Sequence, residues 1–315
     1  MKLVLALTAL AFSAPVLAQD GRPFTVAESG RGFARLQQAV DAIGGEDGTI
    51  HIAPGTYREC AIVPKGRVAF VATQPGTAIF DGVTCEGKAA IVLKGQDAHV
   101  EGLVFRNMAV SDQNGAGIRL EWGSLTVKDS AFRDSQEGIL TADSPDGFIQ
   151  NLTVEGSTFS GLGVCPDGGS CAHSIYVGVS KGTVIVRRSR FERGTGGHYL
   201  KTRAAHIEVT DTSFDDSRGR DTNYMIDLSG GANGIIARNI FVQGPSKENH
   251  TCFISVAPEG DGHPSAGLVF ADNRATLAPG AKYDMAFVAD WQHQPLKIAR
   301  NRIGPGITPF VTKNR

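Results

Sequence analysis

VEGLVF (residues 100–105), VKDSAF (127–132) and VEGSTF (154–159) are three copies of one six-residue pattern. Each copy begins with an aliphatic residue and ends five positions later in Phe, with small and polar residues near the centre. The pattern recurs along the chain, and its last positions are Phe105, Phe132, Phe159, Phe191, Phe214, Phe241, Ala275 and Ile303. These positions span 198 residues in seven steps, so one repeat is about 28 residues long.

A repeat of this length cannot bury its apolar face alone, whereas stacked copies share one continuous core. The segments alternate with the period of strands, and the turns are rich in Gly, Asn, Asp and Ser. The sequence therefore predicts an all-β fold, a right-handed parallel β-helix. A propeller needs about four strands per 40–50 residues, and a β-sandwich does not repeat one hexapeptide, so both rival folds are disfavoured.

The N-terminal part of the chain has the pattern of a cap. FARLQQAVDAI (33–43) has the apolar spacing of an amphipathic helix, and GTIHIAPGTYRE (48–59) follows as a strand and a turn. A helix there covers the open end of the strand stack, which otherwise presents unpaired N–H and C=O groups.

This segment resembles the start of pectate-lyase-like β-helix proteins, and the repeats from about Thr49 to Ile303 extend the resemblance over most of the chain. The resemblance implies the parallel β-helix fold. It leaves the function open, because this scaffold carries lyases, hydrolases, esterases, epimerases and adhesins. We expect one monomeric β-helix domain over 19–315, with its N-terminal cap over about 19–48.

The first eighteen residues, MKLVLALTALAFSAPVLA, have the form of a secretory signal: one Lys, an apolar run and a small-residue end. The run is too short for a membrane span, and no stop-transfer charges follow it. Cleavage at its end leaves all five cysteines in a chain that we expect to be periplasmic or secreted, where disulfides form. Cys165–Cys171 and Cys60–Cys85 with Cys252 free is the simplest arrangement, and other pairings stay open.

The charge balance argues against one class of partner. The chain has 31 Lys and Arg against 32 Asp and Glu, a net charge of −1, which becomes −2 when Lys2 leaves with the signal. No basic excess is present that would attract a polyanionic backbone, so nucleic acid is not expected as a partner.

Each repeat has a second strand, and six of these strands align: GIRLE, GILTA, SIYVG, YLKTR, MIDLS and FISVA. Their first aliphatic residues are expected to point into the core: Ile118, Ile139, Ile175, Leu200, Ile226 and Ile254. The next residues then point outward: Arg119, Leu140, Tyr176, Lys201, Asp227 and Ser255. Arg203 and Tyr199, two residues either side of Lys201, are expected to point outward as well. Since parallel strands lie about 4.8 Å apart, these side chains predict a polar patch of Tyr176, Tyr199, Lys201, Arg203 and Asp227.

Two histidines lie near this patch. His198 is expected to point inward beside Thr202 and His173, as a hydrogen-bonded ladder residue, and it is also a candidate for substrate binding. His206 is expected at a turn. No carboxylate or Cys accompanies them at a recognisable ligand spacing, so no metal site is predicted from them.

A Lys and an Arg beside aromatic hydroxyls suit β-elimination from a uronic-acid polymer. The proton next to the carboxylate is weakly acidic, and its removal requires the carboxylate to be neutralised, here by Arg203. Lys201 is the expected base, and Tyr176 or Tyr199 the expected acid. The candidate substrate-binding residues are Asp227, Arg119 and His198.

The patch also resembles that of β-helix polysaccharide lyases acting on alginate, pectate or dermatan-type chains, where a Lys and an Arg carry the elimination and an acidic residue or Ca²⁺ assists. Lys201 and Arg203 are the matched residue types, although here they share one strand and no LTLRHG-like segment follows. The resemblance implies a carbohydrate-active protein, with polysaccharide lyase favoured, an acidic polysaccharide as partner and no required cofactor.

Two other functions stay open. A glycoside hydrolase needs two carboxyl groups across the scissile bond, and Asp227 with Asp215, Asp216 or Asp221 offers them, although the motif NTDG is absent. The same three loop aspartates are candidate calcium ligands, with an ordinary solvated turn as the favoured interpretation. The alternative from another class is a secreted glycan-binding or surface protein without chemistry.

Overall fold

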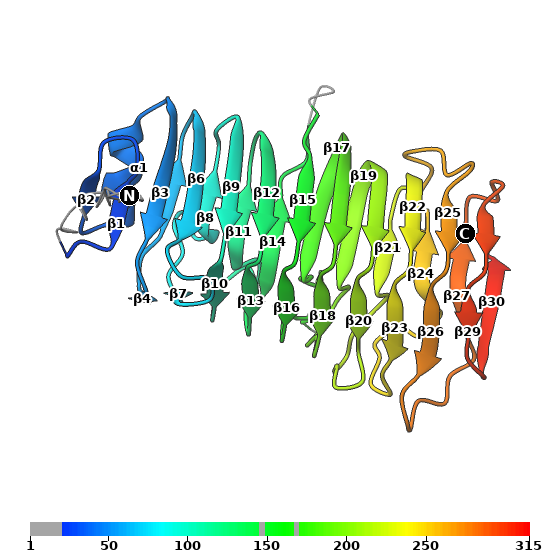
Figure 1. Cartoon of the computed structure of the whole chain (residues 1–315). Coiled ribbons are helices and arrows are strands. Elements are labelled where there is room, and N and C mark those ends of the chain that lie inside the picture. The colour runs from blue at the N-terminus through cyan, green and yellow to red at the C-terminus, as the bar shows by residue number, and fades with distance from the viewer. Residues whose placement is uncertain (1–20, 145–148, 167–169) are drawn as a thin grey trace, which may run out of the picture.

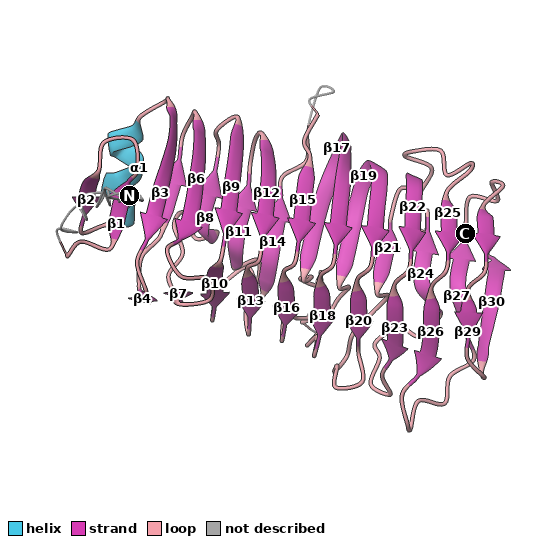
Figure 2. Cartoon of the chain, in the orientation of Figure 1, coloured by secondary structure: helices cyan, strands magenta, loops and turns pink. Residues whose placement is uncertain are grey.

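The computed structural model of the chain describes residues 21–144, 149–166 and 170–315. The expected signal sequence, residues 1–18, lies outside them. The strands wind into parallel coils that stack along one axis (Figure 1). Figure 2 shows that strands dominate the described part of the chain, with one helix at its N-terminal end. The all-β prediction is therefore confirmed.

Each complete coil contributes to three faces of the stack, which we call faces 1, 2 and 3 in the order that the chain visits them. Face 1 contains β3 (Asp47–Ile52), β6 (Arg67–Ala72), β9 (Asp97–Glu101), β12 (Ser124–Lys128), β15 (Leu152–Glu155), the second half of β17 (Ile175–Arg187), the second half of β19 (Leu200–Thr210), β22 (Asn233–Ala237), β25 (Val269–Ala271) and β28 (Lys297–Ala299).

Face 2 contains β4 (Gly55–Tyr57), β7 (Ala78–Asp81), β10 (Leu103–Arg106), β13 (Ala131–Arg133), β16 (Thr158–Ser160), β18 (Arg190–Glu192), β20 (Ser213–Asp215), β23 (Ile240–Gln243), β26 (Arg274–Leu277) and β29 (Arg302–Ile303). Face 3 contains β5 (Ala61–Val63), β8 (Ala89–Leu93), β11 (Ala116–Leu120), β14 (Glu137–Thr141), the first halves of β17 and β19, β21 (Ile226–Leu228), β24 (Cys252–Val256), β27 (Met285–Asp290) and β30 (Ile307–Thr312). The long strands β17 and β19 run from face 3 into face 1 and join the two faces.

The six-residue pattern is the corner between face 1 and face 2. In the coil of 127–132, Val127 points into the core from β12 and Phe132 points into it from β13. Phe132 lies in register with Phe105 and Phe159, and the rings stack at 5.1 and 4.8 Å. The stack begins earlier than the hexapeptides indicated, because Tyr57 and Phe80 continue it in the first coils. This aromatic column forms one edge of the core.

A second ladder runs through the same corner. The residue before each ladder position has a positive φ, as in Asp129 (46°) and Asp211 (54°). The ladder side chain then accepts the backbone N–H of its counterpart one coil earlier, and the bonds measure 2.9–3.3 Å from Leu103 to Asn301. Its members are Ser130, Ser157, Ser189, Thr212, Asn239, Asn273 and Asn301. Polar residues therefore satisfy buried backbone groups at a corner where strand pairing is interrupted.

The expected N-terminal helix is confirmed as α1 (Leu36–Ile43). Its buried side chains are spaced at i, i+3, i+4 and i+7: Leu36, Ala39, Val40 and Ile43. The helix packs against β5 and against β1 (Phe24–Val26) and β2 (Arg31–Phe33), and β1 pairs antiparallel with the first strand of face 1. Together these elements cover the first coil.

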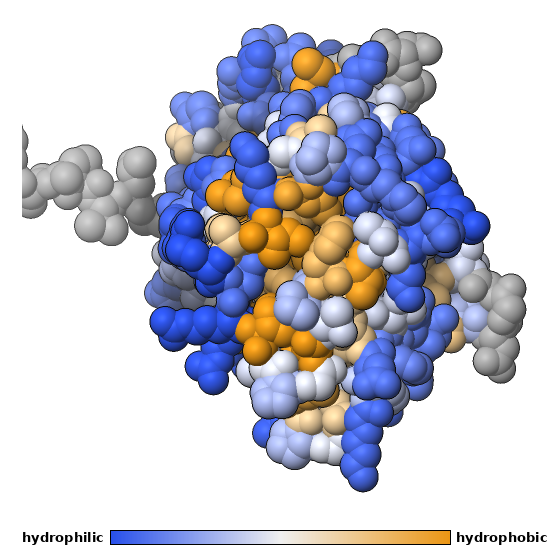
Figure 3. Space-filling view, turned by 90° about the vertical axis from the view of Figure 1, so that its right-hand side faces the viewer, coloured by the Kyte–Doolittle hydropathy of each residue, from blue (hydrophilic) through white to orange (hydrophobic). Residues whose placement is uncertain are grey.

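The C-terminal end of the stack differs from the N-terminal end. Figure 3 shows that apolar residues gather at its centre, inside a hydrophilic rim. A hollow of about 340 Å³ lies there against Phe287, Ile298 and Ile303, and Phe310 is 37% exposed. Within the described residues, β28, β29 and β30 are paired on one side.

The cysteines pair as the simplest arrangement predicted. Cys60 bonds to Cys85 and Cys165 to Cys171, while Cys252 is free and buried. The second bridge lies directly before the strand that carries Tyr176. No helix in the part of the chain that the structure describes is long and apolar enough to cross a membrane.

We expect Asn239→Ala to lower the free energy of unfolding by on the order of 2–4 kcal/mol, because the change leaves the buried Thr212 N–H and Val209 C=O without their partners. Asn233→Ala is the matched control, because Asn233 is exposed and donates to a single carbonyl, that of Ala266. It should change stability by less than about 0.5 kcal/mol. Urea denaturation of both variants measures the difference, and equal midpoints would contradict the structural role of the ladder.

Candidate functional site

The strand register confirms the row of neighbouring residues that the sequence predicted on the outside of the second strands. This row lies on face 3. Arg119 pairs with Leu140, Leu140 with Tyr176, Tyr176 with Lys201, and Lys201 with Asp227. The six residues expected to point inward are all buried in the core. The sequence alignment of the second strands therefore has the correct register over these coils.

A hollow of about 280 Å³ lies over the middle of this row. The residues that line it come from face 3, from the loop closed by the second disulfide and from the loop after β24: Ser170, Cys171, His173, Tyr176, His198, Lys201, Arg203 and Glu259. Three of the predicted catalytic residues, Tyr176, Lys201 and Arg203, are brought together there.

The two cations of the site converge on one carboxylate. Lys201 Nζ donates to Glu259 Oε1, and Arg203 Nη2 donates to Glu259 Oε2. Arg203 also donates through Nη1 to the hydroxyl of Tyr176, and its guanidinium carbon lies 5.3 Å from the centroid of that ring. The Lys201 side chain is 11% exposed, whereas that of Glu259 is 42% exposed. The site therefore presents two fixed positive groups beneath an accessible carboxylate.

Asp227 lies where the register predicts, but its carboxylate is buried. Ser229 and Ser255 donate to its two oxygens at 2.8 and 2.7 Å, and Lys201 Nζ lies 3.3 Å from Oδ2. A buried charge is tolerated only when it is paired and hydrogen-bonded, as here. Asp227 thus orients the Lys201 side chain. Both oxygens of Asp227 are already engaged by Ser229, Ser255 and Lys201.

Glu259 was not predicted from the sequence. It is 58 residues from Lys201 and 56 from Arg203, in a loop whose residues, APEGDGH (257–263), have the composition of an ordinary turn. The stacking of coils brings this loop over the row, because β24 lies two strands along from β19 on face 3. No local pattern marks the residue.

The outward orientation expected for Tyr199 is wrong. Its side chain is 1% exposed and packs edge-on against Phe191 and Phe214 in the core. Its hydroxyl donates to Asp216 at 2.7 Å, and burial with this carboxylate raises its pKa well above the ordinary range. Tyr199 precedes the first residue of β19, at the corner where the chain enters face 3, so strand alternation does not extend to it. Tyr199 is therefore not a candidate for the acid that protonates a leaving group.

His198 is also oriented differently from the expectation. It lies beside His173, as predicted, and the two rings stack at 4.9 Å, but its ring lies on the outer side, with Nε2 3.5 Å from Asp227 Oδ2. Burial and the charge of Lys201 hold the pKa of both imidazoles well below the usual range, so both rings are neutral. His173 Nδ1 accepts the backbone N–H of His198 at 2.9 Å, which places the proton of His173 on Nε2. The pocket thus has two neutral imidazoles in its wall.

Glu137 is a second residue that the sequence did not indicate. It occupies β14 one coil before His173, is almost fully buried, and its carboxyl oxygens have no hydrogen-bond partner among the described residues. Burial raises the pKa of Glu137 well above its ordinary value of 4.5. In the sequence, Glu137 is a lone charged residue at the start of the GILTA strand. A charged residue at that position is typical of an ordinary strand end.

The loop aspartates do not form a site on the outer surface. Asp216 is fully buried, accepts hydrogen bonds from Tyr199 and Thr222, and pairs with the buried Lys247 at 3.3 Å. It cannot serve as a hydrolase carboxyl beside Asp227, because substrate does not reach it. The described residues include no group of three or more His, Cys, Asp or Glu that could hold a metal ion.

Two further residues lie apart from the hollow. Arg119 is separated from the Lys201 strand by β14 and β17, and it pairs with Glu121 at 3.1 Å. His206 lies within β19 rather than at a turn, because this strand continues from face 3 into face 1. Neither residue lines the hollow.

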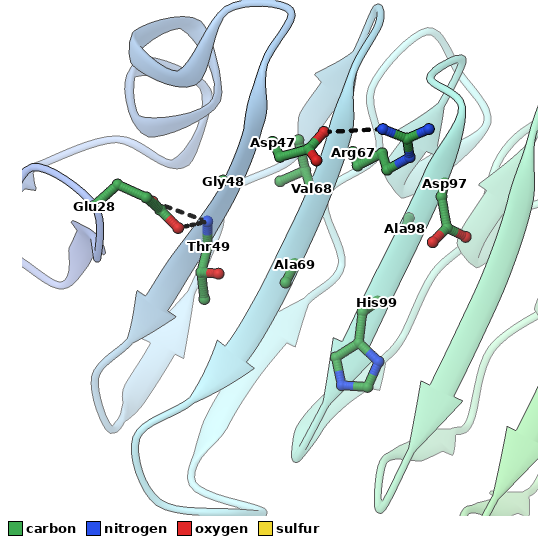
Figure 4. A pocket seen from close by; sticks show the side chains of 10 residues that line it. All are labelled: Glu28, Asp47, Gly48, Thr49, Arg67, Val68, Ala69, Asp97, Ala98 and His99. Atoms are coloured by element: carbon green, nitrogen blue, oxygen red, sulfur yellow. Dashed lines mark hydrogen bonds and ion pairs between the residues drawn. The ribbon is translucent and has the colours of Figure 1, made fainter.

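A larger hollow, of about 420 Å³, lies on face 1 near the N-terminal end (Figure 4). Thr49 and Ala69 are small and leave the space of this hollow, and Glu28 and His99 flank it. Its charges are engaged locally, since Glu28 accepts the Thr49 N–H and Arg67 pairs with Asp47. The smaller hollow on face 3 is the better candidate, because its cations converge on one point.

The chain belongs to the right-handed β-helix family, since the family model described as the right handed beta helix region matches residues 70–244, more than half of the chain. This confirms the pectate-lyase-like resemblance and the handedness expected from the sequence. Comparison with curated proteins gave no match.

Solved structures include two of similar fold. An alginate lyase from Paenibacillus sp. str. FPU-7 is 16% identical with a TM-score of 0.62, over 87% of this chain and 94% of that one. ORF18 of Geobacillus virus E2 is 11% identical with a TM-score of 0.54, over 88% of this chain and 56% of that one. At these identities the similarity is one of fold.

We expect Glu137→Gln to stabilise the protein at pH 8 by on the order of 1–2 kcal/mol and to have little effect at pH 4. A carboxyl whose pKa is raised by folding contributes its stability below the unfolded pKa, near 4.5, and loses it as the pH rises through the folded value. Gln removes that loss because it stays neutral. Thermal denaturation across this pH range measures the effect, with Glu101→Gln on the outer surface as control; parallel stability profiles for native and Glu137→Gln protein would contradict it.

Proposed function

We propose that the protein is an exported polysaccharide lyase that cleaves a uronic-acid-containing glycan by β-elimination. The observation that carries this proposal is the convergence of Lys201 and Arg203 on a single carboxylate, that of Glu259, beside the Tyr176 hydroxyl. A bound uronate needs its carboxylate in such a position before its neighbouring proton can be removed.

The electrostatic requirement comes first. Removal of the proton at C5 places negative charge on the carboxylate, and preorganised cations stabilise that charge without reorganising during the reaction. Arg203 offers planar N–H donors for this charge and is held by its contact with the Tyr176 hydroxyl. Proton transfer then needs a base and an acid within reach of the same sugar.

The proposed proton transfers use Lys201 and Tyr176, which both line the hollow. The base is Lys201, which acts as the free amine and takes the C5 proton of the uronate. The C5 electron pair forms the C4–C5 double bond as the C4–O bond breaks, and Tyr176 protonates the departing glycosidic oxygen. Face 3 therefore supplies the acceptor of the C5 proton, Lys201, and the donor to the leaving oxygen, Tyr176.

Other observations support the carbohydrate class and the export. A solved structure of similar fold is an alginate lyase, and the chain shares that fold over most of its length. Two disulfides are consistent with an oxidising compartment, in agreement with the signal-like first eighteen residues. The burial of Asp216 removes one carboxyl that a hydrolase mechanism would have used.

We expect the purified protein to generate the ultraviolet absorbance of a C4–C5 unsaturated uronate on at least one of alginate, pectate, glucuronan and the glycosaminoglycans. Each polymer is incubated with and without added calcium, so that a cation requirement is detected. New reducing ends without absorbance would instead indicate hydrolysis. Binding of a polymer without either product would indicate a glycan-binding protein, and both results contradict the lyase proposal.

On the active polymer, Arg203→Lys should lower kcat/KM by an amount equivalent to on the order of 2–3 kcal/mol, because the charge stays but the planar fork is lost. Lys201→Met should lower turnover more than binding, because the base acts only in the transition state. Arg187→Lys is the matched control, since Arg187 makes a similar surface pair with Glu208 on face 1. Equal activity of Arg203→Lys and the control would contradict the role of Arg203.

A further inference from the structure

The carboxylate of Glu259 occupies the place that the proposed reaction assigns to a substrate group. We propose that Glu259 is a built-in competitor, which a free sugar carboxylate must displace, and that the site therefore selects a planar carboxylate that shares its two oxygens between Lys201 and Arg203. This inference rests on the proposed function for the sugar involved, and on the geometry of Glu259 for the selection.

The geometry defines the ligand group. Glu259 Oε1 accepts from Lys201, and Oε2 accepts from Arg203, so each cation binds one oxygen of the same planar group. A uronate carboxylate has the same two oxygens and the same charge. Its methyl ester has no charge and a single carbonyl oxygen, so it cannot replace Glu259 on equal terms.

The backbone that carries Glu259 is held in place. The N–H groups of Ala257 and Glu259 donate to the carbonyls of Leu228 and Ser229 at 2.8 and 3.0 Å. His263 Nε2 lies 3.1 Å from the carbonyl oxygen of Arg203, and its backbone N–H donates to Gly230 at 2.8 Å. The loop is thus anchored at both ends of the segment that crosses the hollow.

The Glu259 side chain, by contrast, can rotate away from Lys201 and Arg203. It is 42% exposed, and a Cβ at the next residue, Gly260, would meet no atom within 4 Å. Rotation of the side chain moves the carboxylate into solvent while the backbone hydrogen bonds stay in place. Displacement therefore needs a change of side-chain rotamer and no opening of the loop.

Competition of this kind lowers the apparent affinity for the ligand. When the binding-competent state is only a fraction of the population, the apparent dissociation constant rises by the inverse of that fraction. Replacing Glu259 with an uncharged side chain removes the competing carboxylate from both cations, while Lys201 keeps its contact with Asp227 and Arg203 its contact with Tyr176. The variant should therefore bind simple uronates more tightly than the native protein.

The test uses Glu259→Gln with sodium glucuronate and sodium galacturonate as probes, in NMR titrations. We expect the affinity of the variant for at least one probe to be about fivefold or more above that of the native protein. The methyl ester of the same uronate should bind neither the variant nor the native protein. Asp272→Asn is the charge-matched control, because Asp272 pairs with Arg300 on the surface, and it should leave the affinity unchanged.

Three results would overturn the inference: unchanged or weaker uronate binding by Glu259→Gln, equal binding of the methyl ester, or an equal gain in Asp272→Asn. A gain that disappears when Arg203→Lys is added supports it, because the oxygen bound by Arg203 then loses its partner. Binding is measured without turnover. A negative lyase assay therefore does not decide the result of the binding test, and a negative binding test does not decide the result of the lyase assay.

Discussion

The stack depends on the hydrogen bonds that cross the corners between faces 1 and 2 from Leu103 to Asn301. A backbone N–H of one coil donates to a Ser, Thr or Asn side chain of the next, as from Thr212 to Asn239 at 2.9 Å. Strand pairing is interrupted at this corner, so the backbone groups would otherwise be buried without partners, which costs free energy at every coil. The ladder satisfies them, and the aromatic column beside it closes the core.

This corner sets the register of the whole stack, and the register assembles the site. Because each coil is aligned with the next, single residues of consecutive coils become neighbours on face 3, as Tyr176, Lys201 and Asp227 do. The row tolerates a buried carboxylate because Ser229, Ser255 and Lys201 surround it. A fold that repeats with small variations can thus concentrate charge at one coil while the remaining coils supply rigidity.

Much of this arrangement could be predicted from the chain. The hexapeptide spacing, the capping helix and the alignment of the second strands placed Tyr176, Lys201 and Arg203 together, since strand periodicity relates neighbouring residues directly. Tyr199 was misplaced because it lies at a corner, where two consecutive side chains face the interior. Met225 occupies the same place one coil later and is also buried. Alternation holds within a strand and fails where the chain bends.

The sequence alone determined the repeat, the parallel β-helix and the row that carries the cations, because each follows from local spacing repeated many times. It favoured the observed disulfide pairs but left other pairings open. Only the tertiary structure decided what completes the site. Glu259 reaches Lys201 and Arg203 from more than fifty residues away, and Glu137 loses its contact with water because neighbouring segments cover it. Burial and long-range contact depend on which loops fold over which coil, and single residues in turns carry no repeated pattern that would reveal it.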